Sequence, residues 1–344
     1  MGSTTHSSDA QTPPAQTPPG LTHTRVTLRM AVVVALGMGL IAAGVVLRPP
    51  PRDGLFWSGG DRESYFEHKL QATQRADVVL AGNSHVYRGL SPKAIEAALG
   101  DRRTVYNFGF SAAAFTPDYL AAVRQQLSPD AKRPTIVLGL SPIALSDRTA
   151  HSNGFTKASR RARSTHIMGW SLPTQWTLPL SPYRRITDLK RFGRPWPQWN
   201  PNTPHTIDQA ETVYFEQAHP NGWVASWSEP QLQTDFERTH RAYQKYTRGP
   251  MIQPKLLANL LETIERWTQQ GITVVALRPP VDASIRALEN GPGQFNEDEL
   301  AAKLQKAGAR WLKLDPAQYP TYDGHHLRRD GALKLSQTLG TFLR

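Results

Sequence analysis

Three short segments of the chain carry side chains that together could perform nucleophilic catalysis. They are residues 82–85 (Gly-Asn-Ser-His), residues 107–111 (Asn-Phe-Gly-Phe-Ser) and residues 322–326 (Tyr-Asp-Gly-His-His). A serine attacks an ester when a histidine removes its proton and an aspartate fixes the tautomer of that histidine. Asp323 and His326 stand three residues apart, so both can point inward from one loop.

Each segment also has an ordinary structural interpretation. A Gly-x-Ser turn often caps a helix, and an Asp-x-x-His sequence is often a surface turn. The positions of the three segments favour the catalytic interpretation, because the segments follow the first, second and last of five predicted strands. The carboxyl ends of parallel strands meet at one edge of a sheet, which is where ligands of such sheets bind.

The five strands are predicted from short apolar runs, and helical patterns separate them. The strands are expected at residues 77–82, 104–109, 134–140, 272–277 and 310–314, and the helices at 92–99, 118–127, 254–270, 297–307 and 330–343. Continuous apolar strands that alternate with helices indicate a parallel sheet covered on both faces. The sequence therefore predicts a three-layer α/β domain over residues 76–344.

A segment of about a hundred residues, 147–249, interrupts this alternation, and loops of such length are usually lids or binding surfaces. Residues 148–200 hold ten lysines and arginines against one acid, Asp188, and six of the nine tryptophans lie in the segment. Tryptophan stacks on sugar rings and arginine pairs with carboxylate or phosphate. A plain hydrophobic core and a surface facing anionic lipid are the alternatives.

The N-terminal region predicts a membrane anchor. Residues 30–47 are uncharged and largely apolar, close to the ~17–25 residues that a spanning helix needs. We expect a tail over 1–26, a single-pass anchor over 27–48, a linker and lead-in over 49–75, and a domain outside the cytoplasm, periplasmic or extracellular. A cleaved signal peptide is the alternative, with Ala-Ala-Gly at 42–44 as its small residues.

The absence of cysteine excludes disulfides, thiolate zinc sites and cysteine nucleophiles. The adjacent His325 and His326 could bind a metal ion. Asp323 is the only other potential ligand nearby in the sequence, so this segment does not contain a usual set of metal ligands. We therefore predict no metal and no cofactor. The net charge of +12 favours an acidic partner or surface. Nucleic acid is not expected, since the domain faces outward and no recognition module is visible.

On these residues the chain resembles the SGNH/GDSL hydrolase superfamily, over residues 75–145 and 253–344. The resemblance implies a flavodoxin-like αβα domain. It also implies that Ser84 is the nucleophile and that Asp323 and His326 complete the triad. The backbone N–H groups of Ser84 and Gly109 would then hold the oxyanion.

Two departures from the family pattern bear on activity. Asn83 replaces the aspartate of Gly-Asp-Ser, and residues 139–142 read Gly-Leu-Ser-Pro where the family has Gly-x-Asn-Asp. The side-chain amide that completes the oxyanion hole is therefore missing, unless Ser141, Asn107 or Asn83 supplies a substitute. Loss of this block is similar to the membrane-linked branch that handles cell-envelope polymers, including DltD-like and alginate-acetylation-like proteins.

Five further residues are expected to bind substrate: Asn83, His85, Ser141, Arg278 and His325. Arg278 follows the fourth predicted strand and could clamp an anion, or it could belong to an ordinary loop.

The expected function is that of a membrane-anchored serine esterase or O-acyltransferase for acyl esters of a cell-envelope polysaccharide. Its partners would be an acyl donor, a polysaccharide or lipid acceptor, the membrane and an integral-membrane acyltransferase. The alternative is a catalytically inactive binding or assembly protein with the same fold.

Overall fold

The computed structural model describes residues 30, 32–38, 62–71, 75–167, 205–206, 213–229 and 233–344. The expected tail, most of the expected anchor and linker, and much of the basic part of segment 147–249 lie outside these residues. Residues 30 and 32–38 are helical. Across the described ranges, no helix combines the length and the apolar character that a membrane crossing requires.

The predicted parallel sheet of five strands is confirmed. Its strands are β1 (Val78–Gly82), β2 (Val105–Asn107), β3 (Thr135–Gly139), β7 (Thr273–Leu277) and β8 (Arg310–Leu312). All neighbouring pairs are parallel, in the order β2-β1-β3-β7-β8. This is the flavodoxin-like order, in which the direction of winding reverses between β1 and β3. Ligands of such sheets bind at the carboxyl ends of the strands beside that reversal.

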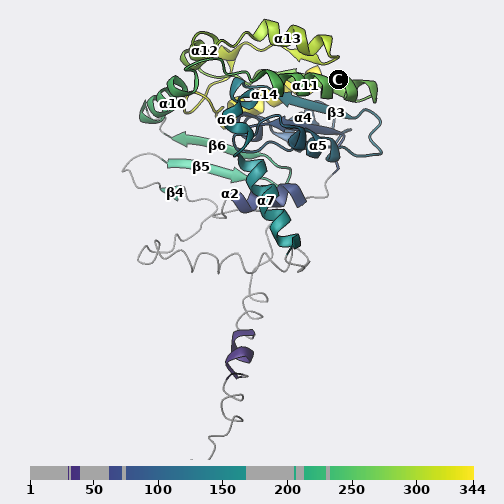
Figure 1. Cartoon of the computed structure of the whole chain (residues 1–344), viewed down its shortest axis with the longest axis vertical. Helices are drawn as coiled ribbons and strands as arrows, with labels where there is room; N and C mark the ends of the chain where they lie inside the picture. The colour runs from purple at the N-terminus through teal and green to yellow at the C-terminus, as the bar shows by residue number, and fades with distance from the viewer. Residues whose placement is uncertain are drawn as a thin grey trace, which may run out of the picture. The chain divides into compact units, whose positions relative to one another are not determined.

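Helices cover both faces of the sheet (Figure 1). One face carries α5 (Pro117–Gln125), α11 (Pro254–Gln269) and α13 (Glu297–Lys306), and the other carries α3 (Ser84–Gly89), α4 (Pro92–Ala98) and α14 (Arg329–Phe342). Val79 and Ala81 of β1 pack in the first of these apolar layers, and Val78 and Leu80 pack in the second. This alternation follows from the two-residue period of a strand.

Further helices surround this layered core. They are α2 (Arg62–Gln71), α12 (Ala283–Asn290), the 3-10 helix η1 (Pro142–Leu145) and the 3-10 helix η4 (Pro316–Gln318). Asp282 caps α12, because its side chain accepts the N–H of Ser284.

Segment 147–249 contains a second, antiparallel sheet that the sequence analysis did not predict. The described elements of this segment are α6 (Asp147–Ala150), α7 (Gly154–Ile167), β4 (His205–Thr206), β5 (Val213–Ala218), β6 (Val224–Glu229) and α10 (Gln233–Tyr246). The strands pair in the order β4-β5-β6 (Figure 1).

The turn between β5 and β6 packs against the end of the main sheet. Asn107, the last residue of β2, donates its N–H to the carbonyl of Asn221 at 2.9 Å. Trp223 donates its indole N–H to the carbonyl of Arg88 at 2.8 Å, and Arg88 forms an ion pair with Glu216 at 2.9 Å. The β5–β6 hairpin is therefore attached to the helix that begins at Ser84.

Candidate catalytic site

Ser84 stands at the first position of α3, directly after β1. The chain can turn here because residue 82 is a glycine: a Cβ on Gly82 would lie 2.8 Å from the carbonyl oxygen of Gly139 and 2.5 Å from a methyl of Val86. Asn83 caps the helix by accepting the N–H of His85 at 3.1 Å. Ser84 is partly exposed, whereas Gly82, Asn83 and His85 are buried.

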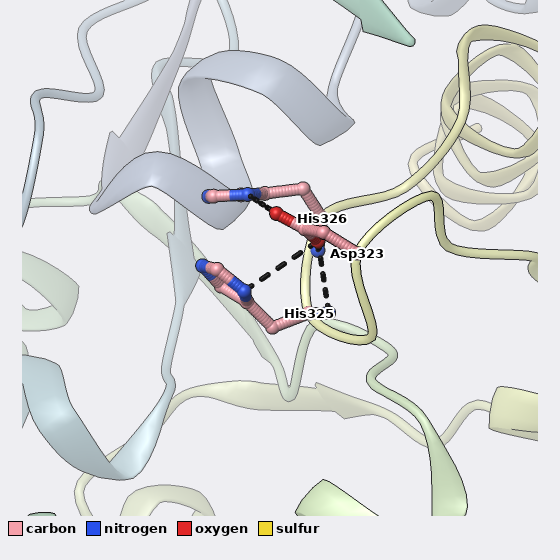
Figure 2. A group of neighbouring side chains, drawn as sticks. All are labelled: Asp323, His325 and His326. Atoms are coloured by element: carbon pink, nitrogen blue, oxygen red, sulfur yellow. Dashed lines mark hydrogen bonds and ion pairs between the residues drawn. The ribbon is translucent and has the colours of Figure 1, made fainter. Parts of the chain in front are cut away.

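The Asp-x-x-His sequence forms a closed loop after β8. Tyr322 donates its N–H to the carbonyl of His326 at 3.0 Å, and Gly324 adopts a φ of 89°, which favours glycine. One oxygen of Asp323 accepts the backbone N–H groups of His325 (3.1 Å) and His326 (2.8 Å). The other lies 2.8 Å from Nδ1 of His326 (Figure 2). The loop thus holds the carboxylate and the imidazole together.

This contact sets the tautomer of His326. A carboxylate is only an acceptor, so Nδ1 carries the proton and Nε2 carries the lone pair. Nε2 is buried and has no hydrogen-bond partner within the described part of the chain, and Ser84 is therefore not bonded to it in this structure. A ring in this state suits a general base.

The electrostatics of the loop keep the histidine neutral and the aspartate charged. Burial lowers the pKa of His326 to about 4, although the Asp323 carboxylate acts in the opposite direction. Burial alone would raise the pKa of Asp323, but attraction to the rings of His326 and His325 and the hydrogen bonds from His326 hold that pKa well below its usual value. At neutral pH the pair is imidazole and carboxylate.

A third imidazole, from α3, meets this loop. The ring centre of His85 lies 5.3 Å from that of His325 and 5.7 Å from that of His326, and the latter two are 3.6 Å apart. The start of α3, with Ser84, therefore lies beside the Asp323 loop. We call His85, Asp323, His325 and His326 the base side of the site.

Gly109, one of the two residues expected to stabilise an oxyanion, is already hydrogen-bonded, and so is Asn107, considered as a substitute. Gly109 donates its N–H to the side chain of Asn107 at 3.0 Å. The amide nitrogen of Asn107 donates to the carbonyls of Val86 (2.9 Å) and Leu90 (2.8 Å). Gly109 thus lacks the free N–H that the oxyanion assignment requires, and Asn107 offers no substitute.

Ser141, which was considered as a substitute for the missing amide, is also hydrogen-bonded. Asn83 donates its amide N–H to the hydroxyl oxygen of Ser141 at 2.6 Å, and both side chains are buried. We call Asn83, Asn107, Gly109 and Ser141 the oxyanion side of the site. Asn83 and Ser141 thus bond to each other, although one N–H of Asn83 and the hydroxyl proton of Ser141 are not used in this bond.

The expectation that Arg278 clamps an anion is wrong for this structure. Its guanidinium is buried and bonds to Glu289 at 2.6 Å, Glu297 at 3.1 Å and Asn290 at 3.0 Å, and it packs over the ring of Phe295. A cation engaged by internal carboxylates is not presented to substrate.

The other expected substrate-binding residues differ in exposure. Asn83, His85 and Ser141 are buried, whereas the side chain of His325 is 21% exposed. Of this set, His325 is the most exposed.

The sequence analysis missed the residues that support His326. The ring of Tyr322 stacks on that of His326, with centres 5.8 Å apart. The Tyr322 hydroxyl accepts a hydrogen bond from Arg88 at 3.2 Å and lies 3.4 Å from the hydroxyl oxygen of Ser226 in β6. Tyr322 directly precedes Asp323 and could have been considered, but nothing in the sequence connects it with Arg88 or Ser226.

A buried lysine was also missed. Lys69 of α2 donates to the carbonyls of Gly109 (2.5 Å) and Gly222 (3.0 Å), and its ammonium faces the rings of Tyr65 and Phe110. Burial lowers the pKa of Lys69 well below its usual value. Lys69 therefore connects three parts of the chain: α2, residues 107–111 and the β5–β6 turn.

Comparison with known proteins adds little to this geometry. No protein-family model matches the chain, and no curated protein matches it. A solved structure from Streptococcus pneumoniae, whose description refers to a platelet activating factor, aligns with 91% of this chain and 99% of its own at 11% identity and a TM-score of 0.38. A likeness this distant says nothing about the function of the chain.

Proposed function

We propose that the chain is a serine-dependent esterase or O-acyltransferase of the SGNH/GDSL type. One observation carries the proposal: Asp323 holds His326 so that its unprotonated Nε2 is buried and unpartnered among the described residues. That ring lies beside His85, the residue that follows Ser84 at the start of α3. This arrangement supports Ser84 as the nucleophile, His326 as the base and Asp323 as the group that orients the base.

The reaction begins when Nε2 of His326 accepts the hydroxyl proton of Ser84. The Ser84 oxygen attacks the carbonyl carbon of the ester, and Asp323 stabilises the imidazolium that forms. His326 then protonates the leaving alcohol. Water or an acceptor hydroxyl releases the acyl group from Ser84, again with His326 as base. Because Ser84 does not bond to His326 in this structure, its side chain must rotate toward the ring when substrate binds.

The backbone N–H of Ser84 is the oxyanion donor that we assign. Ser84 is the first residue of α3, so its N–H has no partner within the helix. The N–H of Gly109 can contribute only after it leaves Asn107. Loss of one such donor costs about 10²–10³ in rate in other enzymes, so we expect slow turnover on simple esters.

The substrate that we propose is an acyl ester of a cell-envelope polysaccharide, with a polysaccharide or lipid as acceptor. Support comes from the sequence: the apolar stretch at 30–47 favours anchoring beside the envelope, and the basic, tryptophan-rich segment 147–249 suits an anionic sugar polymer. We also propose a single-pass anchor and a domain outside the cytoplasm. An integral-membrane acyltransferase would hand over the acyl group.

One observation favours a second function. Each amide of the oxyanion side has at least one hydrogen-bond partner, as expected of a protein that keeps the fold but has lost catalysis. A binding or assembly protein of the envelope is therefore the second candidate.

Labelling of the full-length chain with a fluorophosphonate probe separates the two. We expect wild type and the control Ser111→Ala to be labelled and Ser84→Ala to be unlabelled, because only an activated serine reacts. Ser111 is a suitable control because it is partly exposed, like Ser84, and follows Gly109 closely. Thermal unfolding shows whether each variant is folded. Equal labelling of Ser84→Ala, or a folded but unlabelled wild type, would contradict the enzyme assignment.

A further inference from the structure

The base side brings together three imidazoles from two distant parts of the chain. His325 and His326 are neighbours on the Asp323 loop, and His85 reaches the same place from α3, with ring centres 5.3 and 5.7 Å from theirs. The sequence offered only two adjacent histidines and one aspartate. The fold adds the third imidazole, which completes a set of nitrogen donors.

Each of these rings has a buried nitrogen without a hydrogen-bond partner. The atoms are Nε2 of His85, Nδ1 of His325 and Nε2 of His326, as judged within the ranges that the structure describes. Nδ1 of His325 lies 3.5 Å from a carboxylate oxygen of Asp323. His85 is only 4% exposed. Buried polar atoms are nearly always hydrogen-bonded, so the unsatisfied Nε2 atoms of His85 and His326, with the His325 ring beside them, call for a ligand that accepts lone pairs.

Two of the rings are oriented as metal-binding histidines are. Such residues almost always donate their other ring N–H to a carboxylate or a carbonyl oxygen. Nδ1 of His326 lies 2.8 Å from the Asp323 carboxylate, and Nδ1 of His85 lies 2.9 Å from the amide oxygen of Asn83. In both rings Nε2 is left with a lone pair to give.

The spacing of the loop residues suits a single ion. One potential ligand atom each from Asp323, His325 and His326 lies within 4.8 Å of the others, and Figure 2 shows both rings on the same side of the loop. Zinc–nitrogen bonds are about 2.0–2.1 Å long, so the rings of His325 and His326 must rotate to share one ion. His85 is not part of this closely spaced group, and its Nε2 must move toward the loop to join them. We propose that His85, His325 and His326 bind a divalent transition-metal ion, with Asp323 as the carboxylate that orients His326.

The donor set indicates which ion. Imidazoles without hard oxygen ligands suit zinc, copper or nickel and not magnesium or calcium. Three protein nitrogens with a fourth position open is a common zinc arrangement. Zn²⁺ is therefore the probe of choice.

The metal and the serine chemistry compete for one atom. The lone pair on Nε2 of His326 either binds the ion or accepts the Ser84 proton, so a bound Zn²⁺ inhibits acyl transfer. The metal site itself goes beyond the proposed function and does not depend on it.

Calorimetric titration of Zn²⁺ into the metal-free, full-length chain without a histidine tag tests the site. We expect one ion per chain. His85→Gln and His325→Gln should each weaken binding by at least about 10–100-fold, the loss typical even of residues that only orient a ligand. Ser84→Ala should bind as wild type does, and so should His151→Gln, whose side chain is 84% exposed elsewhere on the chain. Absence of stoichiometric binding, or binding unchanged in both ligand variants, overturns the proposal.

Two measurements use only the wild-type chain, so they test the proposal even if the variants do not fold. Co²⁺ should give the intense visible absorption of a four-coordinate nitrogen site, and the weak absorption of the hydrated ion would overturn the proposal. Zn²⁺ should slow fluorophosphonate labelling, and labelling at an unchanged rate under saturating Zn²⁺ would overturn His326 as a ligand. A chain that binds Zn²⁺ but is never labelled contradicts the proposed function and supports the metal site.

Discussion

The base side and the oxyanion side of the site are both buried, but they use their hydrogen-bonding groups very differently. Three ring nitrogens of the base side have no hydrogen-bond partner among the described residues. The amides of the oxyanion side all have one: Gly109 bonds to Asn107, Asn107 bonds to α3, and Asn83 bonds to Ser141. The base side can accept a proton or an ion, whereas the amides of the oxyanion side are already engaged in hydrogen bonds.

The difference separates two requirements of acyl transfer. Proton removal needs a free lone pair, which the base side has. Stabilisation of the transition state needs free donors aimed at the developing charge, and on the oxyanion side only rearrangement would release them. The site as it stands is therefore better prepared to take up a proton than to stabilise an oxyanion.

The largest expected effect comes from breaking the base side at Asp323. Asp323→Asn should lower kcat on a small ester by about 10⁴-fold, since an amide no longer fixes the tautomer of the histidine. Steady-state kinetics on an activated acetyl ester measures it. Asp330→Asn, on the exposed first turn of α14, is the control and should leave kcat unchanged. An equal loss in both variants would remove Asp323 from the mechanism.

The next effect tests whether Arg278 belongs to the site or to the scaffold. Arg278→Met leaves Glu289 buried without its cation, so the free energy of unfolding should fall by about 3–5 kcal/mol. KM for an anionic ester, measured below the unfolding transition, should not change. Arg266→Met removes an exposed arginine and should cost little. A stable Arg278→Met protein with a raised KM would restore the anion clamp.

A smaller effect is expected on the oxyanion side. Asn107→Leu leaves the carbonyl of Leu90 without its donor, while the carbonyl of Val86 keeps the N–H of Leu90. An unsatisfied buried group costs about 1–3 kcal/mol. Urea unfolding measures the loss, with Gln125→Leu, an exposed amide in α5, for comparison. The substitution also frees the N–H of Gly109. A rise in kcat would show that this side is inhibited by its own hydrogen bonds.

The smallest effect is the response to pH near neutrality. The base must be unprotonated, and the pKa of His326 is lowered to about 4, so kcat/KM should stay flat down to about pH 5 and fall only below that. A pH profile of kcat/KM tests this. A midpoint near 6.5, the ordinary value for histidine, would show that the ring is more accessible to water than the structure indicates.

The parallel sheet could be predicted because its strands are continuous apolar runs. The predicted run 77–82 became β1 (Val78–Gly82), and 272–277 became β7 (Thr273–Leu277). The helix that follows β1 was missed, because the six residues of α3 are too few to show a helical period. The antiparallel β4-β5-β6 sheet was not predicted, because β5 and β6 are short strands that mix polar and apolar residues and lack a continuous apolar run.

Within the site, contacts between neighbours in the sequence could be predicted, and contacts between distant residues could not. Asp323 and His326 are three residues apart, so their pairing could be anticipated from spacing alone. The partners of Arg278 and Gly109 are set by packing: nothing around Arg278 signals that Glu289 and Glu297 will enclose it. The orphaned nitrogen of His85 depends on a loop more than two hundred residues away.

The position of α14 has a consequence for how the protein matures. This last helix packs on α3 and α4, and the hydroxyl of Ser336 accepts the N–H of Ser91 at 2.7 Å. The loop with Asp323 and His326 directly precedes it. Contacts between such distant parts of a chain form late, after the entropy of closing a long loop has been overcome. The Asp323 loop can therefore meet the start of α3 only after this distant part of the chain has packed.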